Sequence, residues 1–158
     1  MQKIVPFLWF DDKAEEAVNF YVSVFENSKI TSITHYPEQV PGPKGKVISL
    51  TFELQGQEFM ALNGGPEVFA FSGAISFFVK CKTQKEVDYF WEKLSEGGEK
   101  QQCGWLKDKY ALTWQVVPTV LGELLNDSDP EKVKRVTEAM LRMKKIVIEE
   151  LEEAYRQR

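Results

Sequence analysis

The segment Gln102–Gln115 holds the side chains best suited to chemistry, since a thiol, two tryptophans and an amide lie within one predicted hairpin. Cys103 could serve as a nucleophile if a nearby base or positive field lowered its pKa from about 8.5. No histidine is close in sequence, so a small buried apolar role is favoured for this thiol. Trp105 precedes the turn, where its ring could either stack on a flat or cationic ligand or pack in the core.

Strand alternation separates the last residues of this hairpin into two faces. Thr113 and Gln115 share one face, whereas Trp114 lies on the other. If the amide of Gln115 faces a cavity, Trp114 faces the helices and is expected to anchor the core. The charged residues 107–109 are expected to form a solvated turn, which the carboxylate of Asp108 could cap. These residue types indicate a pocket more than a reaction centre.

The composition is typical of a globular protein with one domain. The 158 residues are 43% hydrophobic and 28% charged, and no run of about 20 apolar residues could span a membrane. The N-terminus lacks the features of a secretory signal, so we expect a cytoplasmic location, in which Cys81 and Cys103 are free thiols. The net charge is −4 and the basic residues are scattered, so nucleic acid is not expected as a partner.

An internal repeat indicates which elements position the hairpin. Residues 7–9 align with 77–79 in a predicted strand, and residues 16–24 align with 86–94 in a predicted helix, at an offset of 70 residues. The apolar positions 17, 20, 21 and 24, and again 87, 90, 91 and 94, have the spacing of a buried helical stripe. Capping signatures, Asp12-x-x-Glu15 and Thr83-x-x-Glu86, precede the two helices.

The region between the two copies predicts strands joined by turns. Residues 30–36 are β-rich, residues 37–45 form a loop with three prolines and two glycines, and residues 47–54 alternate strictly. The apolar face of this alternating strand is expected to lie on the helices, while Thr51 and Glu53 lie on the other face. Gln55-Gly56 predicts a turn into the next strand. At the end of that strand Asn63 could expose its amide to a ligand or simply form a turn.

The expected fold class is α+β, with two β-α-β-β-β modules, at about 1–66 and 72–117, that form a curved mixed sheet with outer helices. The inner face is expected to line a ligand cavity. Its polar and aromatic candidates are Gln115, Thr113, Thr51, Glu53, Asn63, Trp105 and Cys103. Residues 118–158 are expected to form a C-terminal helical extension, with Asp129 as a cap and Pro130 at the first helical position. Its apolar stripe is expected to pack on its own sheet or within a homodimer.

Several motifs of this chain resemble the vicinal oxygen chelate superfamily, which includes glyoxalase I, bleomycin-resistance proteins and extradiol dioxygenases, and within it the PhnB-like branch. The motifs are residues 6–11, 14–21, 61–65, 102–105 and 114–115, and the start and end of the tail are similar as well. In this superfamily, inner-face residues hold a divalent metal that chelates two oxygens of the substrate. The resemblance places the four ligand positions near Pro6, near 60–62, near 74–76 and at Gln115. Relatives usually have glycine where Ala111 stands, which implies a differently shaped turn or an earlier strand here.

These positions do not favour a metal site. Only Gln115 could coordinate among the four positions, and Glu53 is an unconventional second candidate on the same inner face. We therefore expect neither a divalent metal nor another cofactor. Some relatives carry the label 3-demethylubiquinone 3-methyltransferase, yet no Gly-x-Gly element follows a strand and opens a helix, so a donor site for S-adenosylmethionine is not expected.

Three hypotheses follow for the function. The favoured one is a homodimeric protein that binds a small, flat or aromatic molecule without metal. The alternative is an enzyme of this superfamily with an unknown substrate, either metal-assisted as a lyase, isomerase or dioxygenase, or metal-free with Glu53 or Tyr110 as a general acid. The third is an interaction module whose helical tail binds a partner protein.

Overall fold

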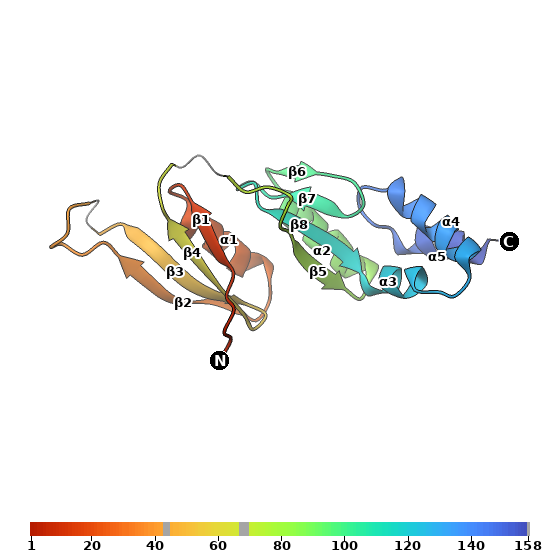
Figure 1. Cartoon of the computed structure of the whole chain (residues 1–158), viewed down its shortest axis with the longest axis horizontal. Coiled ribbons are helices and arrows are strands. Elements are labelled where there is room, and N and C mark those ends of the chain that lie inside the picture. The colour runs from red at the N-terminus through yellow and green to blue at the C-terminus, as the bar shows by residue number, and fades with distance from the viewer. Residues whose placement is uncertain (43–44, 67–69, 158) are drawn as a thin grey trace. The chain divides into compact units, whose positions relative to one another are not determined.

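The computed structural model describes residues 1–42, 45–66 and 70–157 and divides into two compact units, Met1–Ala70 and Phe71–Arg158 (Figure 1). The boundary falls between the two predicted modules, and the helical extension belongs to the second unit. Two residues of the predicted loop at 37–45, positions 43 and 44, lie outside the described residues.

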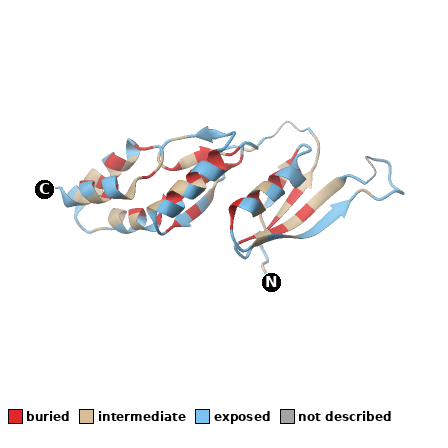
Figure 2. Cartoon of the chain, turned by 180° about the vertical axis from the view of Figure 1, so that it is seen from behind, coloured by how far each residue is buried: buried red, intermediate tan, exposed pale blue. Residues whose placement is uncertain are grey.

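Unit 1 is one β-α-β-β-β module. Its elements are β1 (Phe7–Phe10), α1 (Ala14–Val24), β2 (Ser28–His35), β3 (Val47–Leu54) and β4 (Gln57–Asn63). The strands form a sheet of order β1-β4-β3-β2, in which β1 and β4 are parallel and the other pairs are antiparallel. β2 is one of the two edge strands of this sheet and is exposed along most of its length (Figure 2).

Unit 2 repeats this topology and adds the tail. Its module contains β5 (Phe77–Cys81), α2 (Gln84–Ser95), β6 (Glu99–Lys100), β7 (Trp105–Lys107) and β8 (Thr113–Pro118), with the sheet order β5-β8-β7-β6. The paired arrangement of strand, helix and three strands is thus confirmed, with helices on one face of each mixed sheet. The repeated order follows from the same distribution of apolar residues in both copies.

The alignment of the two first strands at an offset of 70 is wrong by one residue. The buried residues of β1 are Leu8 and Phe10. The buried residues of β5 are Val79 and Cys81, so these are the residues that correspond. The helices do match at 70, since α1 begins at residue 14 and α2 at residue 84. The second strand-to-helix connection is therefore one residue shorter, and the shift reverses which strand residues face the helix.

The helices cover one face of each sheet as expected from their stripes. In unit 1, Ala17 and Tyr21 of α1 are fully buried, as are Leu50 and Phe52 on the apolar face of β3. The turn into β4 has positive φ at Gln55 and Gly56, 50° and 82°, which suits a tight hairpin.

The two predicted helix caps differ in outcome. Thr83 caps α2, because its hydroxyl oxygen accepts a hydrogen bond from the amide of Glu86 at 3.1 Å. The predicted cap at Asp12 is wrong: the cap position of α1 is Lys13, whose side chain makes no capping bond. The amide of Ala14 instead donates to Oδ1 of Asn63 at 2.8 Å, so a side chain from β4 caps α1.

The tail packs against its own unit. It forms α3 (Thr119–Leu125), α4 (Pro130–Leu141) and α5 (Ile148–Arg156), and Asp129 caps α4 ahead of Pro130, as predicted. The apolar stripe is buried in a cluster with the end of β8, made of Val117, Leu121, Val136, Ala139, Met143, Ile146, Leu151 and Ala154. Among the described residues, none of the helices is long and apolar enough to cross a membrane.

Candidate functional site

The sheet of unit 2 carries the candidate site on the face opposite α2. In the sheet register Gln115 pairs with Trp105 of β7 on one side and with Phe78 of β5 on the other. Directly paired residues point to the same side of a sheet, so the three side chains form one row. Trp114 points to the opposite face, is 3% exposed and lies in the core, as predicted.

Two polar groups accompany this row. Nε2 of Gln115 donates a hydrogen bond to Oγ of Ser76 at 2.9 Å, which brings the residue just before β5 beside β8. Thr113 lies on the same face by alternation, and its hydroxyl is buried with no hydrogen-bond partner among the described residues. A buried hydroxyl without a partner costs about 1–3 kcal/mol, so it is an expected contact for a ligand or an ordered water. We refer to Ser76, Phe78, Trp105, Thr113 and Gln115 as the Gln115 face.

The turn beside this face is held together by a buried carboxylate, so the predicted solvated turn is wrong. Asp108 is 2% exposed. Its carboxylate accepts hydrogen bonds from the amides of Tyr110 and Leu112, at 2.8 and 3.1 Å, and from the indole of Trp114 at 2.9 Å. The carboxylate does cap the turn, yet it also fixes the core tryptophan that precedes Gln115. A charged residue between two lysines gave no sign in the sequence that it would be buried.

Ala111 keeps the backbone conformation that glycine would favour. Its φ is 70°, and β8 begins only at Thr113. Both expected alternatives, a different turn and an earlier strand, are therefore wrong. The turn has retained a left-handed residue despite the methyl group, which is a source of local strain.

Neither cysteine has the surroundings of a nucleophile. Sγ of Cys103 donates to the carbonyl oxygen of Met140 at 3.7 Å, and its side chain is half-buried at the edge of the Gln115 face. Cys81 is fully buried, and this burial, with the nearby charge of Glu86, raises the pKa of its thiol to about 12. Both thiols are free.

The other three candidates belong to unit 1. Thr51 and Glu53 lie half-buried on β3, away from its apolar face, and the carbonyl oxygen of Thr51 accepts a hydrogen bond from Thr31. The amide of Asn63 is used internally, because it caps α1 and its Nδ2 also donates to the carbonyl oxygen of Val47 at 3.2 Å. Asn63 is thus a structural residue of this unit and not an amide presented to a ligand.

The metal-ligand positions implied by the resemblance come together in pairs. In unit 1 the amide of Met60 donates to the carbonyl oxygen of Pro6, and in unit 2 Gln115 contacts Ser76. Proline, methionine, serine and glutamine offer no imidazole and no carboxylate, so these residues do not fit a divalent metal. Within residues 1–42, 45–66 and 70–157, no three His, Cys, Asp or Glu side chains are grouped so as to hold a metal ion.

Sequence reasoning missed the places of Ser76 and Phe78 in the site and the burial of Asp108. Ser76 falls in the range assigned by resemblance to the third ligand position, yet only the register of β5 on β8 reveals its bond to Gln115. Phe78 is 53% exposed, and the offset of 70 had aligned it with the buried Leu8 instead of the exposed Phe7.

A doubled β-α-β-β-β fold with polar and aromatic residues opposite its helices defines a protein of the vicinal oxygen chelate type. The model of the family described as 3-demethylubiquinone-9 3-methyltransferase matches residues 2–117, so the chain belongs to this family, the PhnB-like branch of that fold. No curated protein matches the sequence significantly.

Solved structures similar to this chain include a Bacillus cereus protein and a Pseudomonas aeruginosa protein. A putative 3-demethylubiquinone-9 3-methyltransferase, PhnB protein, from Bacillus cereus is 43% identical, with a TM-score of 0.69, and the match covers 75% of this chain and 100% of that one. A Pseudomonas aeruginosa protein is 20% identical, with a TM-score of 0.63, and the match covers 75% of this chain and 98% of that one. The family match ends just before α3, so the helical tail lies outside it.

Proposed function

We propose that this protein binds a small, flat or aromatic molecule at the Gln115 face, without a divalent metal. The observation that carries the proposal is the row of Trp105, Gln115 and Phe78 across three strands. Two aromatic rings on either side of an amide offer apolar area for a planar molecule and a hydrogen-bonding group to orient it.

The polar groups of the face favour a neutral ligand that carries both donors and acceptors. The amide nitrogen of Gln115 is engaged with Ser76, which leaves the amide oxygen to accept a hydrogen bond from a ligand N–H or O–H group. The hydroxyl of Thr113 needs a partner, which a ligand carbonyl or a water beneath it would supply. These groups are uncharged, so they suit a planar organic molecule better than a metal ion or a phosphate.

Methyl transfer, the activity in the names of the family and of the Bacillus cereus protein, is not part of our proposal. The connections from β1 to α1 and from β5 to α2 are residues 11–13 and 82–83, and neither contains glycine. A donor site for S-adenosylmethionine of the usual kind needs a glycine-rich turn at such a connection.

We also propose that the protein acts as a homodimer. Phe7 and Phe78, on the faces of the two sheets opposite the helices, are 52% and 53% exposed. A second copy could cover such residues. Sedimentation velocity should give the mass of a dimer, and a monomer at all concentrations would reject this part of the proposal.

Thermal shift against a panel of planar aromatic metabolites tests ligand binding. A ligand at 100 times its Kd should raise the free energy of unfolding by about 2.7 kcal/mol. Gln115→Ala and Trp105→Leu should abolish that gain, whereas Gln57→Ala, on the exposed part of β4, should retain it. The absence of stabilisation by any compound in the wild type would count against the proposal.

Elemental analysis separates this proposal from the metal-assisted enzyme. The purified protein should hold far less than one equivalent of any divalent metal. A stoichiometric metal that Gln115→Ala removes would support the chelate mechanism instead. Turnover of a bound ligand by the metal-free protein would support the hypothesis of a metal-free enzyme instead of a binding protein.

A further inference from the structure

The connection between α4 and α5, residues 142–147, contacts two parts of unit 2, the start of α2 and the loop that leads into β7. We refer to it as the tail connection. It lies between α4 and α5, beyond the residues 2–117 that the family model matches. Ile146, near its middle, is fully buried, which anchors the connection in the core cluster of the tail.

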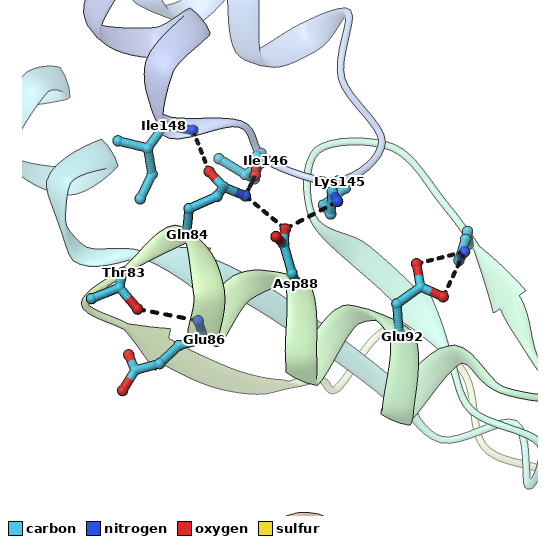
Figure 3. A network of polar contacts seen from close by, with 9 residues as sticks. Thr83, Gln84, Glu86, Asp88, Glu92, Lys145, Ile146 and Ile148 are labelled. Carbon is cyan, nitrogen blue, oxygen red and sulfur yellow. Dashed lines mark hydrogen bonds and ion pairs between the residues drawn. The ribbon is translucent and has the colours of Figure 1, made fainter.

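One side of the tail connection binds the first turns of α2 (Figure 3). The Gln84 amide donates from Nε2 to the carbonyl oxygen of Ile146 at 3.0 Å, and its Oε1 accepts from the amide of Ile148 at 2.8 Å. Nζ of Lys145 lies 3.0 Å from Oδ1 of Asp88, which also accepts from Gln84 at 2.9 Å. The hydrogen bond from Gln84, followed by that from Lys145, lowers the pKa of Asp88 below its ordinary 3.8.

The other side of the tail connection binds the loop that leads into β7. The amides of Cys103 and Gly104 donate to the carbonyl oxygens of Met143 and Lys144, at 2.9 and 2.8 Å. These two loop residues have left-handed φ values of 58° and 82°, and a Cβ at Gly104 would lie 3.2 Å from Cγ1 of Ile146. Gly104 adopts its φ without strain, whereas Cys103 is held in a strained conformation against the tail.

The loop in turn fixes the candidate site. The carbonyl oxygen of Gly104 accepts a hydrogen bond from the amide of Val116 at 2.8 Å, and the next residue, Trp105, pairs directly with Gln115. Val117, two residues beyond Gln115 on the same strand, is buried in the core cluster of the tail. The tail connection thus reaches the Gln115 face through one loop and one strand.

We propose that the tail connection is a positioning element, which sets the place of Trp105 beside Gln115 by tying the 103–104 loop to Gln84 and Asp88. The consequence for ligand binding rests on the proposed function: a ligand on the Gln115 face requires the docked tail connection. By linkage, the same ligand should tighten the docking of the tail.

The test follows Trp105 itself, by ¹⁹F NMR of protein labelled with 5-fluorotryptophan, with the Trp105 resonance assigned through Trp105→Phe. Gln84→Ala should broaden this resonance or move it toward that of the free amino acid. Loss of the two hydrogen bonds from Gln84 to Ile146 and Ile148 should also raise deuterium exchange at the amides of Cys103 and Gly104 by at least about tenfold. Lys145→Ala is a second, milder variant in case Gln84→Ala perturbs the start of α2.

The matched control is Glu92→Ala, which removes the other ion pair of α2 in Figure 3, to Lys100 at 3.1 Å, without touching the tail. It should leave the Trp105 resonance and the loop exchange unchanged. An unaltered Trp105 resonance in both Gln84→Ala and Lys145→Ala overturns the proposal, as does an equal change in Glu92→Ala.

A binding arm uses 2-naphthol as the planar probe. Its Kd should rise about tenfold in Gln84→Ala and stay constant in Glu92→Ala. If the wild type does not bind 2-naphthol, that result counts against the proposed function, and the NMR and exchange results alone decide the positioning role. If Trp105 moves but the Kd is unchanged, the role of the tail connection in binding is rejected.

Discussion

Ala111 allows the strain in the site hairpin to be measured. Its φ of 70° costs an L-residue roughly 1–2 kcal/mol relative to the right-handed region, a cost that glycine does not bear. Glycine, however, loses about 0.5–1 kcal/mol through the greater entropy of the unfolded chain. The side chain is exposed, so little packing is lost. We therefore expect Ala111→Gly to stabilise unit 2 by about 0.5–1 kcal/mol, the balance of these two effects.

Chemical unfolding measures this difference if it reports on unit 2 alone. Of the four tryptophans only Trp9 lies in unit 1, so in a Trp9→Phe background the indole fluorescence follows unit 2. The control is Ala74→Gly, an exposed alanine of the same unit that is absent from the positive-φ residues. It should destabilise by about 0.5–1 kcal/mol, because only the entropy term remains. Equal destabilisation by both substitutions would refute the claim of strain at Ala111.

Three further predictions concern the same unit. Asp108→Ala should lower the free energy of unfolding by about 3 kcal/mol, because two buried donors and one partly buried donor lose their acceptor; a loss below 1 kcal/mol in urea unfolding would contradict this. Thr113→Val should raise stability by about 1 kcal/mol in the same assay, since it removes an unpartnered hydroxyl, and a lower stability would show that the hydroxyl has a partner. Iodoacetamide at pH 8 should label Cys103 and spare Cys81, whose pKa near 12 leaves almost no thiolate until the pH is far higher; equal labelling of the folded protein by mass spectrometry would reject this.

The elements of the fold could be predicted because they depend on local periodicity. The alternation of residues 47–54 gave β3 with its bounds, and the helical stripes gave α1 and α2. The error in the strand alignment arose because residues 7, 77 and 78 are all phenylalanine. Residue type therefore could not show whether Phe77 or Phe78 corresponds to Phe7. Burial shows that Phe78 corresponds to Phe7, since both are half-exposed while the residues that follow them, Leu8 and Val79, are both buried.

The cap of α1 and the turn at Asp108 depend on contacts that a short sequence pattern does not show. Asp12 has the right type and spacing for a cap, yet the oxygen that reaches Ala14 comes from Asn63 on a strand 49 positions later in the chain. Asp108 lies between two lysines, a pattern typical of a solvent-exposed turn. It is buried because the indole of Trp114 and two backbone amides donate hydrogen bonds to its carboxylate. For Asp12 the outcome depends on a contact distant in the sequence, whereas Asp108 is buried by residues two to six positions further along the same hairpin.

The pairing of Ser76 with Gln115 supports the proposal that unit 2 binds its ligand without a divalent metal. The two residues lie where the resemblance places ligand positions and are hydrogen-bonded to each other at 2.9 Å, so each satisfies the other without a cation. A pair of carboxylates at this separation would repel and would need a metal or a proton between them. A serine and an amide need neither, and they leave an oxygen acceptor beside two aromatic rings. Under the proposed function, this pair therefore favours a planar, neutral, hydrogen-bonding molecule over a cation, and the ligand panel tests that preference.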